Sequence, residues 1–209
     1  MVNNKTMNNN IDGVDFSLKE RILKLLIENK EPQTILQISG KLKADYKNTF
    51  QAVNKIYPDL IFKNKIGSLN LVEIKSASSP DIYSLENKRA RQFLNANKKL
   101  SLIKKDIESL NYPFLVALVF GSVVKKTETE KSDIDICIIS DNKLKTEELI
   151  SKLGLLPMNL EIHDFTAREF ESMLEKKENN LASEIIKNNV ILYGIENYYN
   201  LISKWMKKE

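Results

Sequence analysis

The sequence predicts an α/β domain, with a mixed sheet and flanking helices, preceded by a small helical domain that ends in a β-hairpin. Three observations support this prediction. Apolar residues recur at helical spacing over residues 15–56, and they alternate with polar residues over 60–75. From residue 114 onward, strand-like and helix-like segments take turns. The 209 residues are enough for two compact units.

Two capping boxes mark the first helices. In Ser17-Leu-Lys-Glu20 and in Thr34-Ile-Leu-Gln37, a hydroxyl and an acceptor side chain three residues later can satisfy free amides at a helix start. Apolar residues follow each box at helical spacing. We therefore expect one helix over about 18–29 and a short one over about 35–42.

A third helix and a hairpin complete the first unit. The helix is expected from about Tyr46 to Ile56, with Phe50 and Val53 facing inward. The segment LIFKNKIGSLNLVEIK, residues 60–75, alternates apolar and polar residues around Gly67-Ser68, which predicts two paired strands. Three short helices followed by a hairpin indicate a winged helix-turn-helix domain.

In such a domain the third helix enters the major groove of DNA. Asn and Gln suit adenine edges and lysines suit phosphates, so DNA is the expected partner. Protein contacts are an alternative, because the first 85 residues carry a net charge of only +3. A homodimer also stays open, because winged helices often pair to read two half-sites. The expected DNA-binding residues are Lys47, Asn48, Gln51, Asn54 and Lys55 on the helix, and Lys63 and Lys65 on the hairpin.

The charge distribution agrees with two units. Residues 1–113 hold 19 Lys and Arg against 12 Asp and Glu, whereas residues 114–209 hold 13 against 16. A basic N-terminal part joined to an acidic C-terminal part suggests a polyanion-binding module next to a domain in which carboxylates cluster. The expected division is a polar tail at 1–14, the winged helix-turn-helix domain at 15–75, a Ser- and Pro-containing linker at 76–84 and the α/β domain at 85–209.

Composition excludes several other classes. The longest apolar stretch, residues 114–120, has the length of a buried strand, so no membrane span is expected. The first ten residues lack the apolar centre of a signal peptide, which predicts a cytoplasmic protein. The single cysteine, Cys137, lies within an apolar strand and is expected to be an inert buried thiol.

Helices and strands alternate in the second unit. The first element is a long basic helix, and its final strand reads VILYG. Thr166-Ala-Arg-Glu169 is a further capping box between the last two strands. The expected elements are a helix at 85–110, a strand leading into Gly121, a strand at 134–140, a helix near 145–153, a strand at about 159–165, a strand at 190–194 and a terminal helix.

The segment LVFGSVVKKTETEKSDIDICIIS, residues 118–140, contains Gly-Ser, ten further residues, and then Asp, any residue, Asp. Gly121 and Ser122 stand where a buried strand ends, and a residue without a side chain lets backbone amides approach a phosphate. Asp133 and Asp135 are two apart on a strand, so both carboxylates leave one face and can share Mg²⁺. Two like charges held together are costly unless a cation lies between them. This pattern predicts phosphoryl or nucleotidyl transfer.

These residues resemble the signature of the DNA polymerase β nucleotidyltransferase superfamily, and most of all its minimal nucleotidyltransferases, over about residues 88–200. The resemblance implies two Mg²⁺ ions and transfer of a nucleoside monophosphate from an NTP, with ATP expected, to a hydroxyl. It implies that Gly121 and Ser122 hold the triphosphate. It also implies a third carboxylate on a neighbouring strand, which Glu161 matches, with Asp164 in reserve. Minimal nucleotidyltransferases often act as antitoxins that adenylylate a HEPN-domain toxin, so a protein acceptor is implied.

The sequence departs from the family between the serine and the aspartates. Residues 125–129, KKTET, stand where many members have glycine and often arginine, and Lys125 and Lys126 are expected to be solvated. His163 shares the face of Glu161 by alternation, and an ordinary exposed strand histidine is the favoured interpretation. Two other functions stay open. One is a DNA-binding transcriptional regulator whose second domain only senses nucleotide, and the other is a nucleotidyltransferase that acts on RNA ends.

Overall fold

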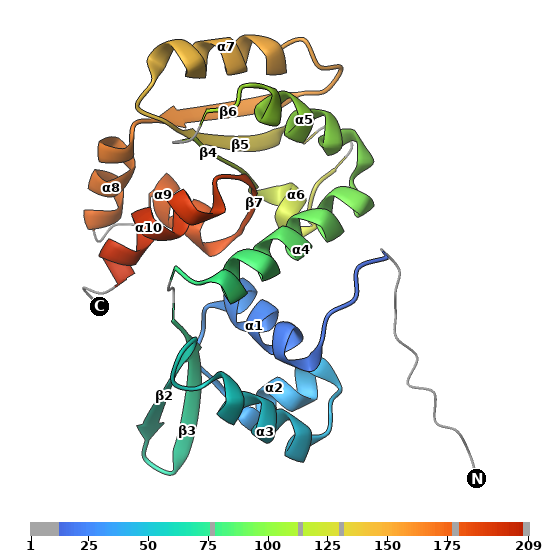
Figure 1. Ribbon diagram of the computed structural model, residues 1–209, viewed down its shortest axis with the longest axis vertical. Coiled ribbons are helices and arrows are strands. Elements are labelled where there is room, and N and C mark those ends of the chain that lie inside the picture. Colours follow the sequence, from blue (N-terminus) through green and yellow to red (C-terminus); the bar gives the residue numbers. More distant parts are fainter. Residues whose placement is uncertain (1–12, 76–77, 113–114, 130–131, 177–179, 207–209) are drawn as a thin grey trace.

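The computed structural model describes residues 13–75, 78–112, 115–129, 132–176 and 180–206 (Figure 1). An N-terminal unit of helices and a hairpin lies beside a larger α/β unit, and helix α4 runs between the two (Figure 1). Most of the predicted tail at 1–14, two residues of the predicted linker, and Phe114 lie outside the described residues. No described helix is both long enough and apolar enough to cross a membrane.

The N-terminal unit contains the predicted helices and hairpin in the predicted order. Both capping boxes form, because Ser17 and Thr34 accept the amides of Glu20 and Gln37, whose side chains accept in return. A two-residue strand extends the hairpin to an antiparallel sheet of order β1-β3-β2. The elements are α1 (Leu18–Asn29), β1 (Gln33–Thr34), α2 (Ile35–Leu42), α3 (Tyr46–Ile56), β2 (Ile61–Ile66) and β3 (Leu69–Ile74).

The prediction that Phe50 faces inward is wrong. Its side chain is 44% exposed and stacks on Tyr46, one helical turn earlier. Thr49 is buried in its place, on the same face as Val53 and Ile56. Burial is tolerated because the Thr49 hydroxyl donates a hydrogen bond of 2.8 Å to the carbonyl of Asp45, so no polar atom is left without a partner.

The larger unit is built on a mixed sheet of order β6-β5-β4-β7. Strands β5 and β6 are parallel, whereas β4 is antiparallel to both β5 and β7. This confirms the predicted α/β fold with a mixed sheet and flanking helices. The elements are α4 (Pro80–Ala96), the 3₁₀ helix η1 (Lys98–Leu100), α5 (Ser101–Ser109), β4 (Val116–Phe120), α6 (Ser122–Lys125), β5 (Ile134–Ile139), α7 (Lys143–Leu153), β6 (Leu160–Phe165), α8 (Ala167–Glu175), α9 (Leu181–Lys187), β7 (Asn189–Tyr193) and α10 (Ile195–Met206).

The long helix expected over 85–110 is two helices. Helix α4 begins at Pro80, inside the segment expected to be a linker, because Ser79 accepts the amide of Ile82 and proline suits the first turn. It ends at Asn97, whose backbone leaves the helical region and whose side chain donates to the carbonyl of Phe93. The chain then turns through η1 into α5.

Helices cover both faces of the four-stranded sheet. Alternate residues of β5 separate its faces: Ile136 and Ile138 pack with α4, α5 and α7, whereas Cys137 and Ile139 pack with α8, α9 and α10. Cys137 is fully buried, as expected, and burial raises the pKa of its thiol. The hydrophobic cluster on the face of Cys137 and Ile139 continues into the core of the N-terminal unit through Ile82 and Leu85 of α4. The N-terminal unit therefore shares a hydrophobic cluster with this face of the sheet, whereas the cluster on the other face belongs to the α/β unit alone.

Candidate active site

Gly121 follows the last residue of β4 and brings the chain close to a carboxylate. Its φ of +73° lies in the left-handed region, which glycine adopts without a steric penalty. A Cβ atom built at Gly121 would stand 1.9 Å from Oδ2 of Asp135. The positive φ favours glycine here, and a side chain would also have to displace the Asp135 carboxylate.

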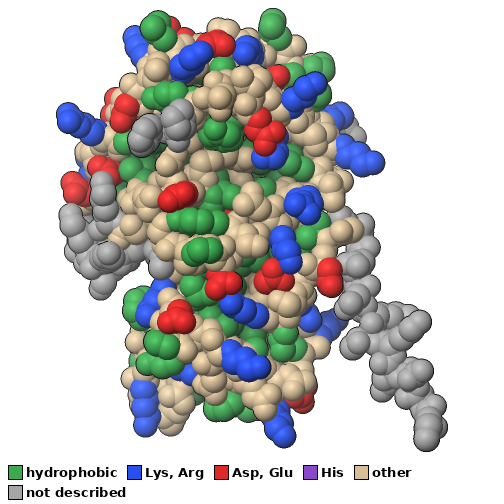
Figure 2. Space-filling model, in the orientation of Figure 1, with side chains coloured by type: hydrophobic (Ala, Val, Ile, Leu, Met, Phe, Trp, Pro, Cys, Tyr) green, Lys and Arg blue, Asp and Glu red, His purple; other side chains and the backbone are tan. Residues whose placement is uncertain are grey.

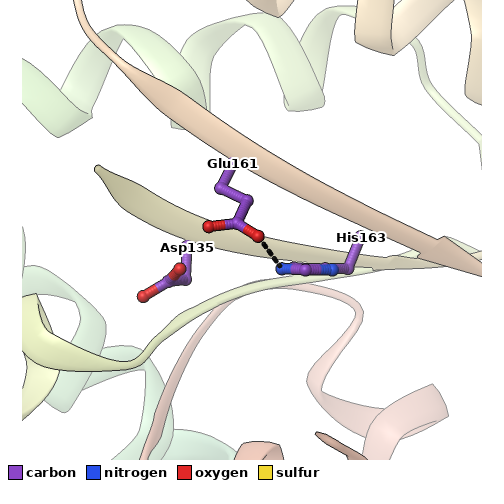
Figure 3. Close-up of side chains that lie close together, drawn as sticks. All are labelled: Asp135, Glu161 and His163. Carbon is purple, nitrogen blue, oxygen red and sulfur yellow. Dashed lines mark ion pairs between the residues drawn. The ribbon is translucent and has the colours of Figure 1, made fainter.

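Three side chains gather at one edge of the sheet: Asp135 from β5, and Glu161 and His163 from β6 (Figure 3). The parallel register places Asp135 directly beside Glu161, and the period of two along β6 places His163 on the same face. One ligand atom from each residue lies within 4.8 Å of the other two. Nε2 of His163 is 3.4 Å from Oε1 of Glu161, the ion pair drawn in Figure 3.

The electrostatics of this cluster favour a cation. The pKa of Asp135 is raised above its ordinary value, first by burial and then by the negative charge of Glu161. Glu184 and Asp133 raise it further, whereas His163 lowers it. The carboxylates around Asp135 therefore repel one another, and a bound cation would remove that repulsion.

Asp133 differs from the other predicted ligands. It precedes β5, is exposed, and is not part of the three-residue group among the described residues.

His163, by contrast, belongs to the group, although the sequence favoured its interpretation as an ordinary exposed residue. Its side chain is 26% exposed and its ring centroid lies 5.6 Å from that of Phe120. The alternation Glu161-Ile-His163 was the sequence signal for it, but the contact with Asp135 depends on strand register.

The segment after Gly121 is held by one local hydrogen bond and by one ion pair to a distant helix. Ser122 opens helix α6, and its carbonyl accepts the amide of Thr127 at 3.0 Å. Lys125 is not simply solvated, since its ammonium pairs with Glu184 of α9 at 2.7 Å. Lys126 is exposed, as expected, and ends α6 in a left-handed conformation with φ of +57°.

The predicted DNA-binding residues lie along α3 and β2. All of them are exposed except Lys63, which is half-buried, contacts the side-chain oxygen of Asn54 and lies 4.6 Å from the ring centroid of Tyr57. On the face shown in Figure 2, Lys and Arg side chains of the N-terminal unit are spread out, with hydrophobic side chains between them. The exposed pair of Tyr46 and Phe50 adds aromatic surface to α3. The residues predicted for this helix are Lys47, Asn48, Gln51, Asn54 and Lys55, and those for the hairpin are Lys63 and Lys65.

Comparison with known proteins gives the class of the larger unit. Residues 103–198 match the family described as polymerase beta, nucleotidyltransferase. This segment contains the whole four-stranded sheet and the group of Asp135, Glu161 and His163. This match supports the resemblance to nucleotidyltransferases for residues 103–198. A solved structure described as a crystal structure of a toxin-antitoxin with AMP-PNP is 23% identical, with a TM-score of 0.35, and the similarity covers 50% of this chain and 85% of that one. Comparison with curated proteins gave no match.

Proposed function

We propose that this protein is a divalent-metal-dependent nucleotidyltransferase. One observation supports the proposal most strongly: Asp135 and Glu161 stand side by side across the β5–β6 pair, with Asp135 against Gly121, in a segment that matches the nucleotidyltransferase family. The repulsion between the carboxylates at this edge favours the binding of a cation.

The donor atoms fit the expected ions. Carboxylate oxygens are the ligands that Mg²⁺ prefers. Asp135 and Glu161 supply them at one edge of the sheet (Figure 3), and Asp133 lies two residues before Asp135, just ahead of β5. We propose that these residues hold two divalent cations, with Mg²⁺ the expected ion and ATP the expected nucleotide. When bound, such ions neutralise the triphosphate and lower the pKa of an attacking hydroxyl.

The proposed reaction exchanges one phosphorus–oxygen bond for another. The hydroxyl oxygen of the acceptor bonds to the α-phosphorus of the NTP, the bond from that phosphorus to the bridging oxygen breaks, and pyrophosphate leaves. The hydroxyl proton passes to the carboxylate of Glu161. The backbone of Gly121 and the hydroxyl of Ser122, at the end of β4, would hold the triphosphate during this exchange.

For the acceptor we propose a hydroxyl on a protein in the cytoplasm, of the kind found on a HEPN-domain toxin. This part of the proposal rests on the sequence resemblance to minimal nucleotidyltransferases. The alternative acceptor is the end of an RNA molecule, and a labelling experiment separates the two because the labelled species differ in sensitivity to protease and ribonuclease.

The test is to incubate the purified full chain with Mg²⁺ and each α-labelled NTP, with and without cell lysate. Label on protein or RNA should fall at least roughly 100-fold in Asp135→Asn and in Glu161→Gln. The matched control is Asp164→Asn, an exposed carboxylate on the other face of β6, which should keep wild-type transfer. Equal labelling by wild type and Asp135→Asn would overturn the proposal.

A second candidate function is DNA binding by the N-terminal unit, which we propose to be a winged helix. The exposed polar face of α3 beside Lys65 of the hairpin favours it. Substituting both Lys47 and Lys55 by alanine should weaken binding in a gel shift and lower its salt dependence, whereas Lys143→Ala on α7 should do neither. Binding that the double variant leaves unchanged would contradict this assignment. Sedimentation in the same buffers would show whether the chain binds as a homodimer.

DNA binding together with a complete absence of transfer in every mixture would favour the regulator that only senses nucleotide. In that case nucleotide should alter the gel shift, and Asp135→Asn should leave DNA binding itself unchanged. Transfer that requires Asp135 excludes this alternative.

A further inference from the structure

We propose that His163 is a direct metal ligand, and that Asp135, Glu161 and His163 together select a transition-metal ion over Mg²⁺ at one of the cation positions. This inference rests on the proposed metal-dependent function and concerns the same site. It replaces the oxygen-only site expected from the sequence with a mixed site of two carboxylates and one imidazole.

The distances suit a single ion. In sites of this kind each nitrogen or oxygen ligand lies about 2.0–2.2 Å from the metal, so ligand atoms are separated by at most about 4.4 Å. The three candidate atoms are already within 4.8 Å of one another. A side-chain adjustment of a few tenths of an ångström, without movement of the strands, would complete the arrangement.

The fold holds His163 toward the site. Glu161 and His163 leave the same face of β6, and the register with β5 brings Asp135 beside them (Figure 3). The imidazole packs against Phe120, with ring centroids 5.6 Å apart and an interplanar angle of 54°. Because Phe120 directly precedes Gly121, the same strand end that admits Asp135 also positions the imidazole.

The identity of the ligands determines which ion is preferred. Mg²⁺ favours oxygen ligands and retains several waters, whereas imidazole nitrogen favours transition metals. Asp133, which is exposed and outside the group, can serve a second position built from oxygen alone. The two cation-binding positions of the proposed site would then differ, because one would accept Mg²⁺ and the other would prefer a transition metal.

If His163 only orients Glu161 and does not bind the metal, different results are expected. The 3.4 Å ion pair with Glu161 would also allow the imidazole to orient that carboxylate without touching a metal. A positioning role puts no nitrogen on the ion and leaves the choice of ion unchanged when His163 is replaced. A ligand role changes both.

The test uses Mn²⁺ bound to the full chain as a paramagnetic probe. Pulsed electron paramagnetic resonance should detect modulation from one coordinated imidazole nitrogen in the wild type and none in His163→Gln. Mn²⁺ affinity should fall by roughly 10-fold or more in that variant, since loss of even an outer-shell partner costs about 10- to 100-fold. Zn²⁺ should displace the bound Mn²⁺ at far lower concentration than Mg²⁺ does.

A second variant keeps the inference falsifiable if His163→Gln is poorly folded. His163→Asp rebuilds the position with oxygen alone, so the nitrogen modulation should vanish while Mg²⁺ becomes a better competitor. Asp164→Asn is the control and should behave as wild type. Mn²⁺ that binds to wild type without nitrogen modulation would overturn the inference while leaving the proposed transfer intact. Absence of any Mn²⁺ binding, together with absence of transfer in Mg²⁺, would overturn both.

Discussion

Two clusters of charged side chains among the described residues of the α/β unit differ in how their charges are balanced. Between α4 and α10, Arg89 donates to Glu86 at 2.5 Å and to the carbonyl of Asn189 at 3.1 Å, and Tyr199 donates to Glu86 at 2.6 Å. Glu86 and Arg89 are 1% and 5% exposed. At the edge of the sheet, by contrast, Asp135 and Glu161 lie side by side, and His163 is the group of the described residues that offsets their charge. The charges of the first cluster are paired within the chain, whereas at the second the negative charge of Glu161 raises the pKa of Asp135.

The buried group of Glu86, Arg89 and Tyr199 is called the balanced cluster below. The largest predicted effect comes from breaking it. Arg89→Met removes the cation and leaves Glu86 buried with its charge uncompensated, so the free energy of unfolding should fall by about 3–5 kcal/mol in urea denaturation. The control, Arg91→Met, changes an exposed arginine on the same helix and should shift it by less than about 0.5 kcal/mol. Equal effects of the two substitutions would show that the buried pair contributes nothing.

Lys30 lies beside the balanced cluster, close enough for both Arg89 and Glu86 to affect its pKa. Its ammonium donates to the carbonyl of Ile186, and burial, followed by the charge of Arg89, lowers its pKa to about 8. The unfolded chain therefore binds more protons between pH about 8 and 10.5, and stability should rise with pH across that window.

Lys30→Met should abolish that rise, which is on the order of 2 kcal/mol. The control is Lys43→Met, because Lys43 ends α2 in the same left-handed conformation but is exposed. Chemical denaturation at pH 7.5 and pH 10 measures the difference from wild type. A profile for Lys30→Met that runs parallel to wild type would contradict the prediction.

The group of Asp135, Glu161 and His163 is called the unbalanced cluster below. The next effect concerns Gly121, at the end of the strand beside it. Gly121 and Gly67 both have positive φ, +73° and +61°, so alanine strains the backbone at either position. Only at Gly121 would the added carbon collide with Asp135, since Gly67 has no atom within 4 Å of that position. Gly121→Ala should therefore weaken Mn²⁺ binding at least about 10-fold, or about 1.4 kcal/mol. Gly67→Ala should leave it unchanged, and equal affinities would disprove the role of close approach.

The smallest effect comes from relieving the unbalanced cluster. The pKa of Asp135 is raised in the folded protein, so the folded state binds the extra proton and stability falls as pH rises through that range. The penalty is therefore larger at pH 7 than at pH 3. Asp135→Asn should stabilise the metal-free protein at pH 7 by up to about 1 kcal/mol, with no gain at pH 3. A loss of stability at pH 7 in chelator-treated samples would contradict this expectation.

Local signals in the sequence predicted most of the secondary structure. The capping boxes at Ser17, Thr34 and Thr166 all form, because each depends only on contacts between residues three apart. The strand period predicted that Asp135 and Glu161 lie at the sheet surface. That they lie side by side follows from the parallel register of β5 and β6, which residues far apart in the chain determine.

Non-local packing explains what the sequence did not predict. The outward position of Phe50 depends on Thr49 finding a carbonyl partner, and the break at Asn97 depends on how the chain turns into α5. Glu86 and Arg89, three apart on a helix, look like ordinary surface charges until Tyr199 and Asn189 are placed against them. His163 joins the candidate site for the same reason.

The position of β7 has a consequence for synthesis on the ribosome. Strand β4 lies between β5 and β7, yet β7 begins 69 residues after β4 ends. At roughly 5–20 residues per second, the nascent chain carries β4 for about 4–14 seconds before its second neighbour has been made. During that interval one edge of an entirely apolar strand is open to other chains. Slower translation between residues 120 and 189 should therefore lower the yield of native protein.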